Sequence, residues 1–281
     1  MTALALAAIS GVSWGVSDFI AGLAARRTRV LVVLWVSQAV GLLLSALVLV
    51  VTSPPRPPTD DLAFAALSSV AGIGGLAAFY RGLAVGAMSL VAPLSAAGAA
   101  LPVAVGIARG EHPGALQLVG VLAVLVGAAL ASLERDQRGS AASLAPGVPY
   151  ALLAALGFGL FFVAMDGAAD RSPSWALAAN RVTGVTILTV AMVVARPSLP
   201  SGDVRTLAPL ILIGFLDTSA NLLYATASRI GLLSLGAALA SLYPVVVVLL
   251  ARFFLAERLR RAQFVGVVAT LAGVALVTAA R

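Results

Sequence analysis

The chain has 281 residues, of which 61% are hydrophobic and 10% are charged, and its 18 basic and 11 acidic residues give a net charge of +7. Because soluble domains carry about 25% charged residues, this composition excludes an ordinary soluble protein and, with apolar runs of about 20 residues, indicates an integral membrane protein. The basic residues are all arginines and lie mostly in short loops, which favours a role in membrane orientation over nucleic-acid binding, while the absence of cysteine excludes disulfides and thiolate metal sites.

Ten apolar segments follow one another along the chain, at about 3–24, 30–51, 62–84, 87–107, 115–132, 147–165, 174–195, 206–228, 232–254 and 262–280. A helix rises about 1.5 Å per residue, so about 20 residues cross a hydrocarbon core of about 30 Å. The first segment lacks a preceding basic region, so we interpret it as a spanning helix rather than a signal peptide. We therefore predict an all-α integral membrane protein of about ten transmembrane helices, which prolines such as Pro93 and Pro102 allow to kink.

One motif occurs twice. Gly110-Glu111, Gln117, Gly120 and Gly127 return 146 residues later as Ala256-Glu257, Gln263, Gly266 and Gly273. An offset of half the chain length indicates internal duplication. Weaker matches at offsets of 143 to 145 agree with it: Trp14-Gly15 with Phe158-Gly159, Gly41 with Gly184, Tyr80 with Tyr224, and Ser89-Leu90 with Ser234-Leu235. Glu111 and Glu257 precede helices, where the helix dipole stabilises a carboxylate.

The duplication predicts two five-helix repeats at 1–136 and 147–281, joined by a polar linker at 137–146. Because five is an odd number, the second repeat must enter the membrane from the opposite face, which makes the repeats inverted. The loop charges agree with this inversion. The loop after the first segment carries Arg26, Arg27 and Arg29, whereas its counterpart after the sixth carries Asp166, Asp170 and Arg171.

Trp14-Gly15 and the two motif copies resemble the drug/metabolite transporter superfamily, EamA type, over nearly the whole chain. The resemblance implies a multi-pass protein of the cell inner (plasma) membrane, with a central cavity lined by the first four helices of each repeat. It also implies transport of amino acids, nucleotide precursors, sugars, polyamines or drugs, often outward, and no cofactor. Two residues depart from the family pattern: Ala256 replaces a glycine, and Arg81 follows Tyr80 where a small or apolar residue is more common. Arg81 leaves the substrate class open.

Ionisable residues inside spans are costly and face a cavity or a partner. The candidates are Asp18, Arg81, Arg181, Asp217 and Arg252. Arg81 and Arg252 are close enough to segment ends to extend toward the membrane surface. Asp18 could instead pair with an arginine near the membrane edge, and Asp217 and Arg181 could neutralise each other. As the acids well inside spans, Asp217 and Asp18 are also the candidates for proton coupling, with facilitated movement as the alternative.

Polar residues fall on shared helical faces. In the eighth segment Asp217, Asn221 and Tyr224 form one stripe, and in the first segment Trp14 and Asp18 share a face. We predict a central site in which Asp217 and Asn221 hold an ammonium or hydroxyl group and Arg181 holds an anionic group. Asn180 accompanies Arg181 about two turns inside the seventh segment, and Gln38 is its counterpart in the second. Aromatic walls would come from Trp14, Tyr80, Tyr224 and Tyr243.

Other function classes are less well supported. Gly11 to Gly15 formally match the G-x-S-x-G pattern of hydrolases, but the match lies inside a helix and the sole histidine, His112, is in a loop. The sequence contains no Walker A motif or H-E-x-x-H metal motif. We therefore expect a transporter without metal or cofactor rather than an enzyme, with an intramembrane enzyme acting on lipid as the alternative. Two fused repeats can enclose a pathway, so we expect a functional monomer.

The orientation of the termini is not fixed by the sequence. Loops after odd-numbered segments hold ten arginines and those on the other side five, which by the positive-inside rule places both termini outside. The family resemblance implies cytoplasmic termini, and we follow it. A reporter fused to the C-terminus distinguishes the two orientations.

Overall fold

A computed structural model describes residues 2–110, 112, 114–134, 143–169, 172–199, 203–230 and 243–279. Those residues form helices almost throughout. The first half contains α1 (Thr2–Ala25), α2 (Val30–Thr52), α3 (Thr59–Val85), α4 (Met88–Ala96), η1 (Ala97–Ala99), α5 (Ala100–Ala108) and α6 (Ala115–Ser132). The second contains α7 (Val148–Ala169), α8 (Pro173–Ala195), α9 (Val204–Ile230), α11 (Tyr243–Leu255) and α12 (Arg261–Ala279).

The observed helices follow the predicted spans. Seven helical stretches of the described chain are long and apolar enough to cross a membrane, and three shorter apolar helices accompany them. One stretch, Met88–Ala108, joins α4, η1 and α5, so the fourth span has a 3₁₀ turn between Pro93 and Pro102. Large apolar side chains such as Leu43 and Phe253 are strongly exposed, as expected where lipid surrounds the protein. The prediction of an all-α membrane protein with about ten spans is confirmed, although the first half of the ninth predicted segment lies outside the described residues.

One small element was not predicted. β1 (Leu133–Glu134) and β2 (Ser143–Leu144) form an antiparallel ladder of two residue pairs at the junction of the repeats. The end of α6 and the start of α7 are thereby drawn together. This ladder lies beside the predicted linker, most of which is outside the described residues.

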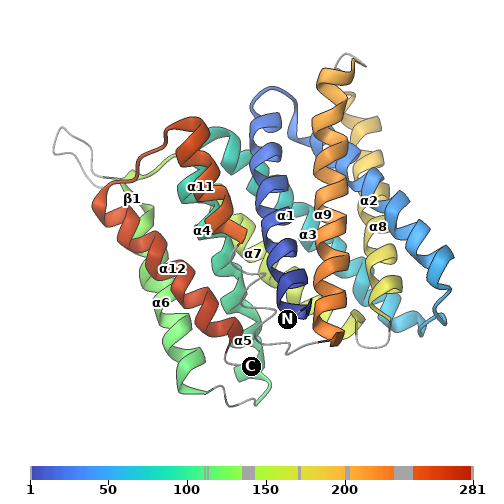
Figure 1. Cartoon of the computed structure of the whole chain (residues 1–281), viewed down its shortest axis with the longest axis horizontal. Helices are drawn as coiled ribbons and strands as arrows, with labels where there is room; N and C mark the ends of the chain where they lie inside the picture. Colours follow the sequence, from blue (N-terminus) through green and yellow to red (C-terminus); the bar gives the residue numbers. More distant parts are fainter. Residues whose placement is uncertain are drawn as a thin grey trace.

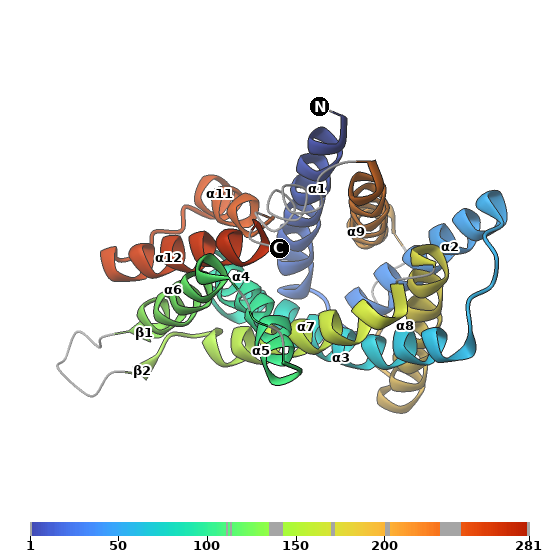
Figure 2. The same ribbon diagram turned by 90° about the horizontal axis from the view of Figure 1, so that it is seen from below.

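Several packing contacts between helices recur between the equivalent helices when the two repeats are exchanged. α1 packs on α9 as α3 packs on α7, α1 on α11 as α4 on α7, and α2 on α9 as α3 on α8. The equivalent helices also pair directly: α2 with α8, α4 with α11, and α6 with α12. Figure 1 shows α6 and α12 side by side at one end of the molecule and α2 and α8 at the other. In Figure 2, α1 and α9 stand on one side and α3 and α7 run together along the opposite side.

Equivalent helices run in opposite directions. A Cβ on Gly120 would approach the carbonyl oxygen of Gly273, and one on Gly127 would approach that of Gly266, so residue numbers rise along α6 while they fall along α12. An antiparallel contact between equivalent helices requires that the two repeats be inverted with respect to each other. The inverted-repeat prediction is thus confirmed.

The duplicated motif builds this α6–α12 pair. Gln117 Oε1 accepts the N–H of Gly114 at 3.0 Å, and Gln263 Oε1 accepts the N–H of Arg260 at 3.2 Å. Each glutamine therefore caps the first turn of its own helix from the third position, as in a capping box. The four glycines that follow allow the two backbones to touch. The motif is explained by packing and needs no part in chemistry.

We expect Gly127→Ala to lower the free energy of unfolding by about 1–3 kcal/mol. The added Cβ would lie 2.5 Å from the backbone nitrogen of Thr270 and 2.7 Å from the carbonyl oxygen of Gly266. Gly74→Ala is the matched control, because nothing lies within 4 Å of the Cβ that it would add and alanine favours helix. Denaturant unfolding in mixed micelles measures both variants. Equal stability of the two would contradict the close crossing of α6 and α12.

Candidate functional site

A buried charged cluster joins three helices, α2, α8 and α9. Arg181 of α8 is 5% exposed. Its Nη1 donates to Gln38 Oε1 of α2 at 2.5 Å, and its Nη2 donates to Asp217 Oδ2 of α9 at 2.5 Å. Gln38 and Arg181 occupy equivalent positions of the two repeats at the same offset as Gly41 and Gly184. Their hydrogen bond therefore joins equivalent helices, so the cluster lies where the two repeats meet.

This ion pair is the mutual neutralisation that one of the two interpretations of Arg181 and Asp217 expects. The two residues neutralise each other. Both terminal nitrogens of Arg181 donate hydrogen bonds to protein groups, so the guanidinium is not positioned as an independent anion site. Breaking such a buried pair is costly because the remaining charge has no counter-charge. The cluster therefore has a structural role whether or not substrate touches it.

A glycine makes space for this cluster. A Cβ on Gly41 would lie 2.7 Å from Thr218 Oγ1 and 3.2 Å from Arg181 Nε. Those two atoms are buried and have no hydrogen-bond partner in the described part of the chain. Buried polar atoms without partners are rare in proteins and are frequent at functional sites. Thr218 was not among the predicted site residues, because its side chain lies one position outside the Asp217 stripe.

Asp18 of α1 differs from Asp217 in having no hydrogen-bond or ion-pair partner in the described part of the chain. Its half-buried side chain makes no hydrogen bond or ion pair among the described residues. The arginine that directly follows this helix, Arg26, lies instead 3.8 Å from Glu257. The alternative in which Asp18 pairs with an arginine is therefore not seen among the arginines that the structure describes. Its carboxylate lies within electrostatic range of Asp217, Tyr80 and Tyr243.

Aromatic rings gather beside Asp18. Trp14 precedes Asp18 by one turn on the same face of α1. Its ring centroid lies 5.9 Å from that of Tyr224 on α9 and 6.5 Å from that of Tyr243 on α11. Tyr80 of α3 is buried, at 3% exposure, and packs on Phe79. The structure thus brings the four predicted aromatic residues to the region of the two aspartates from four different helices.

Local packing fixes the two helices that carry these groups. Ser10 Oγ donates to the carbonyl oxygen of Ala220 at 2.8 Å, and Ser17 Oγ donates to that of Ile213 at 3.0 Å. These two bonds hold α1 antiparallel to α9 on either side of Trp14. The sequence contained a signal that could have identified them, since two serines spaced seven residues apart share one face of an apolar helix.

Some predicted residues are used elsewhere. Asn180 Nδ2 donates to Ser68 Oγ at 2.9 Å, and its carbonyl oxygen accepts a hydrogen bond from Ser69 Oγ at 2.8 Å, so Asn180 joins α8 to α3. Asn221 Nδ2 donates to the carbonyl oxygen of Asp217 at 2.7 Å, one turn back along α9. Both side-chain amides therefore donate hydrogen bonds to the protein itself. The position of an asparagine in the sequence does not predict such a partner.

The arginines near span ends lie on the surface. Arg81 and Arg252 are exposed, as their expected extension toward the membrane surface requires. His112 is also exposed. Within the described residues, no three histidine, cysteine or acidic side chains gather as a metal site would need.

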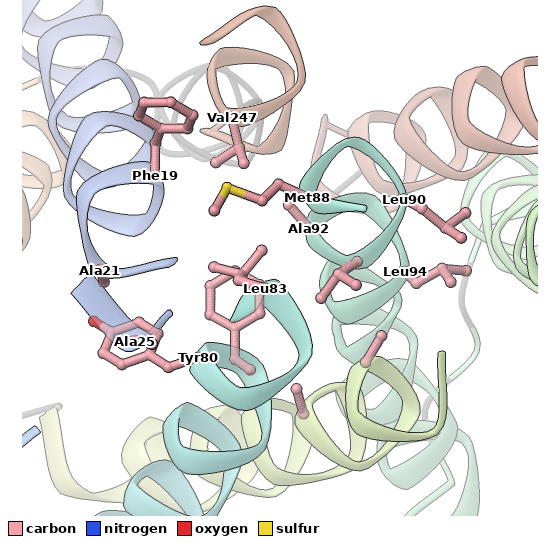
Figure 3. Close-up of a cluster of buried hydrophobic side chains, with 14 of the residues drawn as sticks. Phe19, Ala21, Ala25, Tyr80, Leu83, Met88, Leu90, Ala92, Leu94 and Val247 are labelled. Carbon is pink, nitrogen blue, oxygen red and sulfur yellow. The ribbon is translucent and has the colours of Figure 1, made fainter. Parts of the chain in front are cut away.

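One end of this region is closed by apolar side chains. Phe19 of α1, Leu83 of α3, Met88 of α4 and Val247 of α11 belong to one buried cluster, and Figure 3 shows Val247 and Leu83 on either side of Met88. We call these four residues the apolar plug. Since α11 belongs to the second repeat, the plug joins both halves, and Met88 and Leu83 pack at Gly22, one turn after Asp18 on α1.

A second contact between the repeats lies next to the plug. Glu257 Oε1 accepts the N–H of Met88 at 3.1 Å, while its Oε2 accepts the N–H and the hydroxyl of Ser89 at 2.9 and 2.7 Å. We call this contact the Glu257 latch. The Glu257 carboxylate thus interacts with a helix dipole, as expected. The helix is α4 of the other repeat rather than α12, which follows Glu257 in the sequence. The equivalent Glu111 lies outside the described residues.

Comparisons with known proteins agree with this architecture. The family description "EamA-like transporter family" matches residues 1–133 and 145–279. A solved structure described only as "Crystal structure of protein" is similar with a TM-score of 0.65 and 14% identity, covering 96% of this chain and 95% of that one. At that identity the likeness concerns the fold alone. No significant match is found among curated proteins.

Proposed function

The chain belongs to the EamA-like transporter family, and from this membership we propose that it moves a small molecule across the cell inner membrane, outward, along a pathway between its two repeats. Members of this family are transporters. The pathway would pass the Arg181–Gln38–Asp217 cluster, and this cluster is the observation on which the proposal rests. A charged group between membrane helices is retained where it has a function, because its insertion is costly.

Two further features support a pathway beside this cluster. The aromatic rings of Trp14, Tyr224 and Tyr243 converge there from α1, α9 and α11, and binding sites for small molecules are commonly lined by such rings around a few polar groups. The apolar plug packs together side chains of both repeats at one end of this region. Alternating access requires such a closure on one side of the substrate at a time.

In this proposal each repeat, 1–136 and 147–281, supplies four helices to the pathway, and one chain suffices for transport. Movement is either proton-coupled, with Asp217 or Asp18 carrying the proton, or facilitative. The substrate is an amino acid or a drug-like cation. Neither α6 nor α12 takes part in lining the pathway, since their shared glycine contact occupies one end of the molecule.

Flux into proteoliposomes tests the proposal. The purified chain should carry at least one member of a panel of amino acids, polyamines and cationic dyes, with and without an imposed pH gradient, while protein-free liposomes should not. Dependence of the flux on the gradient separates coupled from facilitated movement. An absence of flux for every compound, together with turnover of a lipid, would replace the transporter with an intramembrane enzyme.

A further inference from the structure

The charges around the site do not balance. Asp217 is paired with Arg181. Asp18 has no ion pair with any arginine that the structure describes. With the three groups ionised, the region has a net charge of −1. A carboxylate without a counter-charge inside a membrane protein is unfavourable and is stabilised by any cation that reaches it.

An anion would find no matching group in the same place. Both terminal nitrogens of Arg181 already donate to Gln38 and Asp217. The remaining nitrogen, Nε, faces Gly41 so closely that a single added Cβ would lie 3.2 Å away. A substrate carboxylate or phosphate would therefore have to displace Asp217 before it could bind the guanidinium.

The groups around Asp18 suit an organic cation. Trp14 shares its helical face, and Tyr243 and Tyr80 lie within electrostatic range of its carboxylate. Aromatic rings attract ammonium and pyridinium ions through their faces at about 6 Å or less from the ring centroid. A bare metal ion prefers a shell of oxygen ligands, whereas an organic cation can place its charge on the carboxylate and its apolar body against the rings.

We propose that the transported substrate is an organic cation whose positive group is bound by Asp18 and whose apolar part packs against the contacting rings of Trp14 and Tyr243. This inference rests on the proposed transport function and specifies its substrate class. It favours the drug-like cation over the amino acid as the substrate. A zwitterionic amino acid would bring its own carboxylate next to that of Asp18, so it would bind more weakly than an amine of the same shape.

Equilibrium dialysis against the full chain in detergent tests the charge requirement. The probes are permanently charged quaternary ammonium and pyridinium compounds, each with an uncharged analogue of the same shape, for example N-methyl-4-phenylpyridinium and unprotonated 4-phenylpyridine. Phenylalanine serves as the zwitterion. We expect the cations to bind at least about tenfold more tightly than their uncharged analogues, a ratio that corresponds to one modest ionic contact.

Asp18→Asn tests the residue. It should remove that preference while leaving the uncharged analogues unaffected, and Asp18→Glu should restore part of it. Asp60→Asn, at an exposed acid outside the site, should change nothing. Loss of cation binding in Asp18→Asn counts only if thermal unfolding shows a folded variant. The comparison of charged and uncharged probes on the wild-type chain decides the charge requirement without any variant.

The outcomes are distinguishable. If the wild-type chain binds uncharged or zwitterionic probes as tightly as cations, or if Asp18→Asn binds cations unchanged, the cation inference is wrong while the proposed transport stands. If Asp18→Asn loses only the response to a pH gradient, Asp18 is a coupling group and the inference is again wrong. If proteoliposomes carry no compound of any class, the proposed function itself fails.

Discussion

Arg181→Ala is expected to lower the free energy of unfolding by about 3–5 kcal/mol, because it leaves Asp217 without its counter-charge in the interior. The side chains are 7% and 24% exposed, so solvent screens the pair only partly. Gln38 loses its hydrogen bond in the same variant. Denaturant unfolding in mixed micelles measures the change. Arg252→Ala removes an exposed arginine and should stay within about 0.5 kcal/mol of the parent chain.

A double variant separates stability from transport. Arg181→Met combined with Asp217→Leu replaces both charges by apolar side chains of similar length, which is often neutral or stabilising for a buried pair. We expect this variant to regain most of the stability and none of the flux. Recovery of flux in the double variant would show that the pair only supports the fold. Full stability of Arg181→Ala alone would contradict the buried ion pair.

The sequence predicted the architecture because the architecture follows from local patterns. Span length, the offset of 146 residues and the odd number of helices per repeat each constrain the fold independently. Gln117 and Gln263 illustrate this, since each caps its own helix and needs no knowledge of distant segments. Features of this kind can be read from one stretch of chain at a time.

The partners of the charged residues could not be predicted in the same way. Helical periodicity shows which face Asp18, Arg26 and Glu257 occupy, but not which helix packs against that face. The structure pairs Arg26 with Glu257 from the other repeat and leaves Asp18 without a partner in the described residues. Residues adjacent in sequence can also bond to different helices. The Asn180 side chain donates a hydrogen bond to α3, while Arg181 donates to α2 and α9.

The two repeats share a scaffold but differ in polarity. At the offset of 144 that relates Tyr80 to Tyr224, the counterpart of Asp217 is Ile73 and that of Asp18 is Phe162. The α3–α7 contact is accordingly apolar, and a Cβ on Gly157 would lie 2.6 Å from the Cα of Gly75. The two acids of the candidate site, Asp18 and Asp217, thus lie on α1 and α9, where the other repeat has apolar residues. Duplication explains the shape, whereas the differences between the copies supply the charged groups of the candidate site.

Opening of the end that carries the apolar plug should be controlled by the Glu257 latch. Glu257→Gln removes the negative charge and one of the two acceptor oxygens that bind the start of α4. Hydrogen bonds to a charged group contribute about 1.5–3 kcal/mol each, and about 1.4 kcal/mol corresponds to a tenfold change in population. We therefore expect the open population at this end to rise at least about tenfold.

Single-cysteine labelling measures that population, because the natural chain contains no cysteine. Ala21 is 0% exposed beside the plug, so Ala21→Cys should react slowly with a membrane-impermeant maleimide and about tenfold faster when combined with Glu257→Gln. Arg27→Cys, in the exposed loop at the same end, should react equally in both backgrounds and reports the side of the membrane. An unchanged rate at position 21 in a folded variant would mean that the plug alone keeps this end closed, because side-chain packing there would outweigh the loss of the latch.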